Sequence, residues 1–235
     1  CLTLSFPGAG FSLLAFAALV PLLISIRRMN TRQAVLAGLA AGFIHFATLI
    51  YWIIPTLNRF GGLHPALAGL ALALLCAYLS LYPAVFVLGI KKTNFSPALF
   101  PVFAACLWTG LEYIRTHALT GFAWGALGYS QHANLMLIQI ADITGVYGVS
   151  FLIVLVNASL AGLWPSSSSI RPGKKRPTGL APAGAVLAVT AAVLAYGVHA
   201  IDRTNRDMET AAAAKTGIIQ GNIRQDVKWD AGYRT

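Results

Sequence analysis

The sequence predicts an α-helical polytopic membrane protein, with about six transmembrane helices followed by the first strand of an α/β domain. Three observations support this class. The mean hydropathy is +0.69, and only 10% of the 235 residues are charged, whereas about a quarter are charged in soluble domains. Apolar residues gather in charge-free runs of about 20, the length that spans a bilayer. Basic residues fall in alternate connections between these runs.

The charge-free runs predict a transmembrane domain over residues 1–201. Its spans are placed near 11–26, 34–57, 65–90, 97–114, 146–164 and 178–200. The first run is short and contains Pro21. Gly38 and Gly42 in the second run form a small-residue pair, which lets two membrane helices approach closely.

The net charge of +10 is compatible with nucleic-acid binding, but the positions of the charges argue against it. Nine of the seventeen basic residues fall in the connections 27–33, 91–96 and 165–177. The opposite connections hold only Arg59 and Arg115. This asymmetry is the positive-inside pattern, and it predicts that the three basic loops are cytoplasmic. We therefore expect membrane lipids, and no nucleic acid, as partners.

The stretch from Glu112 to Asn157 is the most informative part of the chain. Residues 116–141 contain no charged side chain, yet glycines, histidines and amides make them a poor membrane span. Phe122, Trp124 and Tyr129 lie among the glycines, and such rings prefer the depth of lipid headgroups. We predict an ordered loop at one face of the membrane, between a helix ending near Arg115 and another starting near Gly145.

Glu112 and Arg115 lie three residues apart on the last turn of a predicted span, so both side chains are on one helix face. Charged groups at membrane depth are costly and usually face the protein interior. One interpretation is an ion pair that anchors the helix end. The other is that the pair braces the 116–141 loop or meets a lipid headgroup.

The residues beyond the last run differ in composition. Residues 202–214 are polar and then alanine-rich, which suggests a helical or loose stalk. The β-branched run that ends in Gln220-Gly221-Asn222 is typical of a strand entering a loop, so residues 215–235 are predicted to begin a soluble domain. About twenty residues cannot form a hydrophobic core alone. Because residue 1 is Cys and the sequence stops abruptly, we expect a fragment cut at both ends.

Three phrases carry a family resemblance: AYLSLYP at 77–83, LTGFAWGALGYSQ at 119–131 and GIIQGNIRQDVKWD at 217–230. In this order they resemble the bacterial apolipoprotein N-acyltransferases, although Ala123 stands where the family usually has proline. The resemblance implies that residues 215–235 open a nitrilase-like (carbon-nitrogen hydrolase) domain. It also implies a bacterial inner-membrane location, with the soluble domain on the periplasmic side.

The resemblance implies an acyl transfer in two steps. A phospholipid is the acyl donor and passes an acyl chain to a cysteine thiol, and the thioester then acylates the N-terminal diacylglyceryl-cysteine of an apolipoprotein acceptor. The family's catalytic glutamate, lysine and cysteine are expected beyond Thr235, so no catalytic residue is assigned and the fragment is expected to be inactive alone. No cofactor is implied. His45 and His199 have no ligand-spaced partners, so no metal site is predicted.

The same resemblance assigns substrate- or lipid-binding roles to Gly121, Phe122, Trp124, Gln131 and Trp229. Three of them have a simpler alternative: Trp124 as an interfacial anchor, Trp229 as a core aromatic residue, and Gln131 as a buried amide that satisfies the loop backbone. Two other function classes remain open from the residues alone, a multi-span transporter and a non-catalytic membrane scaffold. A transporter should carry polar residues along a pathway through its spans, and here they are few.

Overall fold

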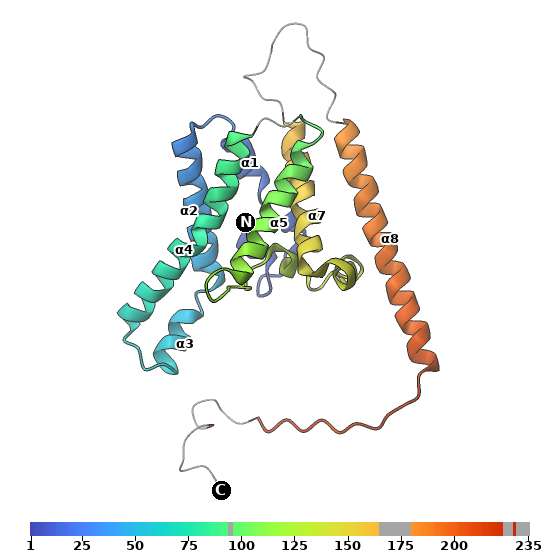
Figure 1. Ribbon diagram of the computed structural model, residues 1–235. Coiled ribbons are helices and arrows are strands. Elements are labelled where there is room, and N and C mark those ends of the chain that lie inside the picture. Colours follow the sequence, from blue (N-terminus) through green and yellow to red (C-terminus); the bar gives the residue numbers. More distant parts are fainter. Residues whose placement is uncertain (94–95, 165–179, 223–227, 229–235) are drawn as a thin grey trace.

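The computed structural model describes residues 1–93, 96–164, 180–222 and 228, and these residues form helices and connecting segments (Figure 1). The α-helices are α1 (Val20–Ser25), α2 (Thr31–Leu49), α3 (Ile53–Arg59), α4 (Pro65–Lys92), α5 (Phe100–His117), α6 (Leu135–Ile138), α7 (Ala141–Leu163) and α8 (Leu180–Thr210). Short 3-10 helices are η1 (Leu2–Ser5), η2 (Ser12–Phe16) and η3 (Leu127–Gln131). No strand occurs in the described part of the chain.

Four helices are long and apolar enough to cross a membrane, which makes the chain a membrane protein. They are α2, α4, α7 and residues Ala183–Thr210 of α8. The first of the other two predicted spans corresponds to a shorter apolar helical segment, Ser12–Ser25, and the second to α5. Helix α5 is less apolar than the four because Glu112, Arg115 and His117 occupy its last turns.

The predicted first span, 11–26, is broken into η2 and α1. The break follows η2 at Ala17, whose φ of −125° is not helical. Asn157 of α7 makes the break stable: its side-chain oxygen accepts a hydrogen bond of 2.9 Å from the Leu19 amide, and its amide group donates one of 2.7 Å to the Ala15 carbonyl. Backbone groups that a continuous helix would pair are thus satisfied by a side chain.

The predicted second span, 34–57, also ends early, because α2 stops at Leu49 and α3 starts at Ile53. Ile50 has φ −111° and ψ 23°, which takes the chain out of the helix. Pro55 lacks an N–H group and would remove a hydrogen bond from a continuous helix. In the structure it lies in the first turn of α3, where an amide would have no helical partner in any case.

Helices α2 and α4 are in close contact through the glycine pair, as the spacing predicted. A Cβ atom on Gly38 would lie 3.0 Å from the Ala84 Cα, and one on Gly42 would lie 2.9 Å from the Pro83 ring. Pro83 itself is inside α4, which continues past it to Lys92. The backbones can approach this closely because the glycines have no side chain.

Helices α5 and α7 form the centre of the bundle, and the 118–140 segment folds back beneath them as a connection that contains η3 and α6 (Figure 1). The prediction of an ordered loop between two helices is confirmed. Ser150 of α7 accepts a hydrogen bond of 2.9 Å from the Gly128 amide, which fixes the loop on α7. Helix α8 lies at the edge of the bundle and packs mainly on α6 and α7.

Helix α8 continues to Thr210, so most of the predicted stalk, 202–214, takes the helical one of its two expected forms. The segment after α8 differs from the prediction. Residues 211–222 are neither helix nor strand, and the predicted strand is therefore wrong for the described residues 215–222. Ile218 and Ile219 are 94% and 96% exposed, because no neighbouring strand covers them or pairs their backbone.

Candidate functional site

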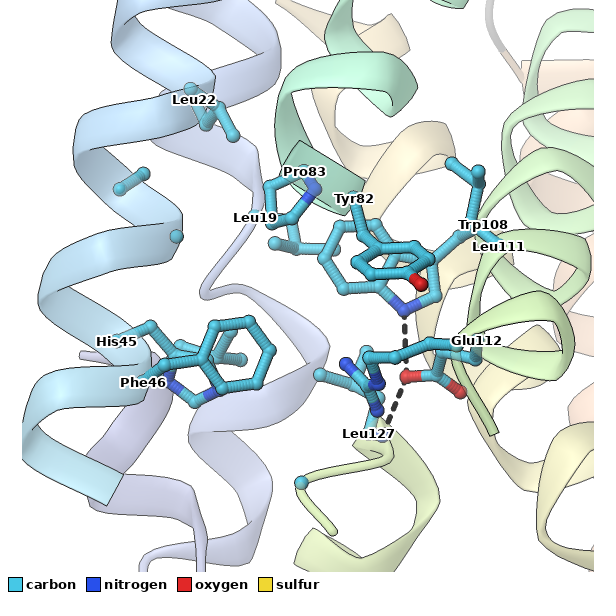
Figure 2. A pocket seen from close by; sticks show the side chains of 15 residues that line it. Leu19, Leu22, His45, Phe46, Tyr82, Pro83, Trp108, Leu111, Glu112 and Leu127 are labelled. Carbon is cyan, nitrogen blue, oxygen red and sulfur yellow. Dashed lines mark hydrogen bonds between the residues drawn. The ribbon is translucent and has the colours of Figure 1, made fainter. Parts of the chain in front are cut away.

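A pocket lies between α2, α4 and α5 and is closed on one side by the start of η3 (Figure 2). Its cavity volume is about 50 Å³, which has room for a few water molecules. That volume is well below the range of small-molecule sites, about 300–1,000 Å³. Its lining is mostly apolar and consists of Leu2, Leu19, Leu22, Ala41, Gly42, His45, Phe46, Tyr82, Pro83, Trp108, Leu111, Glu112, Arg115, Gly125 and Leu127.

One face of α5 supplies a whole wall of this pocket. Trp108, Leu111, Glu112 and Arg115 follow the three- and four-residue spacing that aligns side chains along a helix. Glu112 and Arg115 are each only 3% exposed. The prediction that these two charges share a face directed into the protein is confirmed.

The carboxylate of Glu112 joins α5 to the loop. Its Oε1 atom accepts hydrogen bonds of 2.9 Å from the Trp108 indole and 2.8 Å from the Leu127 amide (Figure 2). The Arg115 carbonyl accepts a further bond of 2.9 Å from the Phe122 amide. Of the two interpretations of the pair, the structure supports bracing of the loop.

The alternative, a direct ion pair between Glu112 and Arg115, is absent: among the described residues the ion pair found is Arg203 with Asp207 on exposed α8. The Arg115 guanidinium instead lies over Phe46, with Cζ 5.3 Å from the ring centroid. Its Nε and Nη2 atoms have no hydrogen-bond partner in the described part of the chain, nor does Oε2 of Glu112. Buried charged groups normally pair all such atoms, so this wall has unused hydrogen-bonding capacity.

The loop residues assigned by the family resemblance gather beside the pocket. Trp124 is 55% exposed and packs edge-on against Trp52, with ring centroids 4.9 Å apart, and against Phe122 at 5.6 Å. Gly121 has φ 76°, and a Cβ there would lie 2.3 Å from the Thr116 carbonyl oxygen. Glycine at this position allows the loop to turn directly after α5. Three assigned residues, Gly121, Phe122 and Trp124, are thus held on one short turn.

The other two assigned residues lie elsewhere. Gln131 is fully buried, and its side-chain amide donates hydrogen bonds of 2.8 Å to the Ser12 carbonyl and 3.0 Å to the Ser130 hydroxyl. It joins η3 to η2 and is not among the residues lining the pocket. Trp229 falls outside the described residues.

Sequence reasoning missed several residues of the pocket, above all Trp108, Tyr82 and Phe46. Trp108 could have been found, because it lies four residues before Glu112 on a predicted helix. Tyr82 belongs to the AYLSLYP phrase but had no assigned role. Phe46 comes from a different helix, and its contact with Arg115 depends on tertiary packing. Among the described residues there is no cluster of three potential metal ligands.

Comparison with known proteins gives consistent matches. The family model described as "Apolipoprotein N-acyltransferase N-terminal domain" matches residues 1–159. An apolipoprotein N-acyltransferase from Geobacter metallireducens is 37% identical over 233 residues, which is 99% of this chain and 43% of that protein. Those from Nitrosomonas europaea and Gloeobacter violaceus are 35% and 30% identical, over 86% and 97% of this chain. The chain spans less than half of the length of these curated relatives.

Proposed function

The chain belongs to the apolipoprotein N-acyltransferase family, and on this premise we propose that it is the membrane part of an acyltransferase that matures lipoproteins. The acyl donor is a phospholipid, and the acceptor is the N-terminal diacylglyceryl-cysteine of an apolipoprotein. The acyl chain passes through a cysteine thioester. The protein lies in the bacterial inner membrane, with the segment after α8 on the periplasmic side.

The chemistry requires a thiol as nucleophile and a base that accepts its proton. In the first step the lipid's ester C–O bond breaks, a thioester C–S bond forms, and the proton ends on the glycerol oxygen. In the second step the acceptor's amino nitrogen attacks the thioester and regenerates the thiol. The only thiols of this chain are those of Cys1, Cys76 and Cys106, and none of the three lines the pocket. We assign the acyl-transfer chemistry to residues beyond position 235.

The contribution of this chain is to hold a lipid-facing loop in place. The observation that carries this role is the buried Glu112 carboxylate, which binds the Leu127 amide and so fixes the loop that presents Trp124. An exposed aromatic cluster on a rigid turn is suited to contact lipid, because aromatic side chains combine apolar area with few rotamers. If Trp124 were only an interfacial anchor, Trp124→Ala would mainly reduce protein abundance and would not slow acyl transfer by the folded protein.

The test is transfer of a labelled acyl chain by the full-length protein. Purified protein in detergent is mixed with a phospholipid carrying a radiolabelled acyl chain and with a synthetic diacylglyceryl-cysteine peptide. We expect label to appear first as a hydroxylamine-sensitive protein adduct and then as an amide on the peptide. Label that never reaches the peptide amine, with folded protein and both substrates present, would contradict the proposed function.

A further inference from the structure

Arg115 and Glu112 have complementary hydrogen-bonding atoms that no described residue uses. The Nε and Nη2 atoms of Arg115 have no hydrogen-bond partner among the described residues, and neither has Oε2 of Glu112. Both residues are only 3% exposed, and both line the pocket between α2, α4 and α5. Nε and Nη2 lie on one edge of a guanidinium, so their N–H bonds run nearly parallel. Burial of such an edge is costly unless an oxygen acceptor reaches it.

The volume of the pocket restricts what this acceptor can be. It measures about 50 Å³, and one water molecule needs about 10–15 Å³ of such space. A lipid headgroup or an acyl chain is far too large. Water is small enough, and it can accept hydrogen bonds from Arg115 while donating its own to Glu112.

The chemistry of the lining determines whether a pocket of this size is dry or hydrated. Cavities with purely apolar walls stay dry, whereas a buried water typically makes about three hydrogen bonds to polar groups. Most of this lining is apolar, but His45, Tyr82, Glu112 and Arg115 also border the space. The free edge of Arg115 and the free oxygen of Glu112 together provide three hydrogen-bonding atoms. The pocket thus has the partners that an ordered water requires.

We propose that ordered water occupies this pocket and bridges Arg115 to Glu112, so that the two residues form a water-mediated ion pair. The water oxygen accepts hydrogen bonds from Nε and Nη2 of Arg115, and the water donates to the carboxylate of Glu112. This water site goes beyond the proposed function and does not depend on acyl transfer.

The charges of the pocket wall favour water over an anion. An anion bound to Arg115 would lie beside the carboxylate of Glu112, and like charges repel strongly where the dielectric is low. Water adds no net charge. A bridging water is also nearly as favourable in enthalpy as a direct hydrogen bond.

The water-mediated pair belongs to the brace that holds the turn around Trp124. The Phe122 amide donates a hydrogen bond of 2.9 Å to the Arg115 carbonyl, and the Leu127 amide donates one of 2.8 Å to the Glu112 carboxylate. Trp124 lies between these two anchored residues in the sequence. Water between the side chains of Arg115 and Glu112 therefore links the anchors of both ends of this turn.

Radiolytic labelling tests the proposal in the unsubstituted protein. X-rays split water into hydroxyl radicals, which oxidise side chains beside a bound water even where bulk solvent does not reach. Phe46 lines the pocket and is 2% exposed, whereas Phe86 is fully buried and is not among the lining residues. The full-length protein in dodecyl maltoside is irradiated, and mass spectrometry measures oxidation of each ring. We expect Phe46 to be oxidised several-fold faster than Phe86, and equal rates would overturn the inference.

High-resolution density locates the water directly. In a structure of the full-length protein that resolves ordered solvent, we expect a peak about 2.5–3.2 Å from Nε or Nη2 of Arg115 and from a carboxylate oxygen of Glu112. A direct contact between the two side chains, or a pocket without density, would overturn the inference. A crystal grown in sodium bromide is the control for an anion. An anomalous bromide peak at Arg115 would identify an anion site and would equally overturn it.

Substitution assigns the water to Arg115. Arg115→Met removes both donors, so oxidation of Phe46 should fall to the rate of Phe86. The matched control is Arg59→Met, because Arg59 also lies over a phenylalanine ring, that of Phe60, but is exposed at the end of α3. This control should leave oxidation of Phe46 unchanged. Undiminished oxidation of Phe46 in folded Arg115→Met would contradict the assignment.

Acyl transfer by the same unsubstituted protein separates the two proposals. A protein that shows the water but transfers no acyl chain would contradict the proposed function alone. A protein that transfers acyl chains but shows no water between Arg115 and Glu112 would contradict this inference alone.

Discussion

The Oε1 atom of Glu112 lies 2.8 Å from the backbone nitrogen of Leu127, fifteen residues further along the chain. This hydrogen bond joins the end of a long helix to the loop that follows it, in a place where both partners are fully enclosed. The same oxygen binds the Trp108 indole. One atom therefore fixes a helix, a loop and one wall of the pocket.

Replacing Glu112 should be costly for stability. Glu112→Ala leaves the buried N–H groups of Trp108 and Leu127 without an acceptor, and we expect a loss of about 2–5 kcal/mol in the free energy of unfolding. Glu112→Gln keeps an acceptor oxygen and should lose less. The measurement is unfolding in mixed detergent micelles. Glu209→Ala, at the exposed end of α8, is the control, and equal effects of both alanine variants would exclude a special role for Glu112.

Asn157 should be needed for the break between η2 and α1. In Asn157→Ala the Leu19 amide and the Ala15 carbonyl lose their side-chain partner, at a cost of about 1–3 kcal/mol. The comparison is Ser159→Ala on the same helix, because the buried Ser159 hydroxyl has no partner among the described residues. That variant should have little effect on the unfolding free energy. A loss in Ser159→Ala as large as in Asn157→Ala would contradict this explanation.

The glycine contact between α2 and α4 predicts a sharp difference between two alanine substitutions. Gly42→Ala places a methyl group 2.9 Å from the Pro83 ring and 3.0 Å from the Ser80 Cα, so the helices must move apart, at about 1–3 kcal/mol. Gly69→Ala, inside α4, meets no atom within 4 Å and should stabilise the helix by up to about 1 kcal/mol. Thermal unfolding in detergent compares the two. Equal shifts would show that close packing at Gly42 is unimportant.

Trp124 distinguishes lipid contact from simple anchoring. If the indole lines the path of the lipid, Trp124→Ala should leave protein abundance normal and slow acyl transfer, by about 5- to 150-fold for a loss of about 1–3 kcal/mol. If it only anchors the loop, Trp124→Phe should be silent and Trp124→Ala should mainly reduce abundance. Thioester formation and transfer to a diacylglyceryl peptide are measured per amount of folded protein. Unchanged rates in Trp124→Ala would remove this residue from the site.

The charge asymmetry predicts the orientation of the chain. Loops 27–33, 91–96 and 165–177 are expected on the cytoplasmic side, and residues 116–141 and the segment after α8 on the periplasmic side. Single cysteines at Ser168 and at Thr210, in a protein without Cys1, Cys76 and Cys106, should differ in labelling by an impermeant thiol reagent. Only the cysteine at Thr210 should react in intact cells whose outer membrane is permeable. Equal labelling, or labelling at Ser168 alone, would show that the orientation is wrong.

Local sequence patterns were sufficient to predict helices α4 and α7, because long charge-free runs leave few alternatives to a membrane helix. They were insufficient where contact with a residue distant in the sequence determines the backbone conformation. Asn157 stabilises the break at Ala17 by accepting a hydrogen bond from the Leu19 amide, 138 residues earlier, and no local pattern shows that contact. A strand at 215–222 similarly requires a neighbour to pair with, and propensity alone does not supply one.

In the candidate site, too, local patterns predicted some features, and contacts between distant segments determined the others. The spacing of Glu112 and Arg115 correctly placed both on one inward-facing side of α5, because helical geometry is local. It could not decide between an ion pair and other partners. That choice depended on the Leu127 amide and the Phe46 ring, which reach the site from separate segments. The family resemblance is confirmed by the match over residues 1–159, while the roles assigned to individual loop residues remain predictions.

The length of α8 affects the position of the segment that follows it. Its 31 residues make a rod of about 46 Å, since a helix rises about 1.5 Å per residue. The hydrocarbon core is only about 30 Å thick, and a tilt of about 20° shortens the rod by less than a tenth. About 10–15 Å of helix is therefore left over for the headgroup layer. Helix α8 thus acts as a spacer that sets the height above the lipid at which the next part of the protein starts, and shortening it by one turn would lower that starting point by about 5 Å.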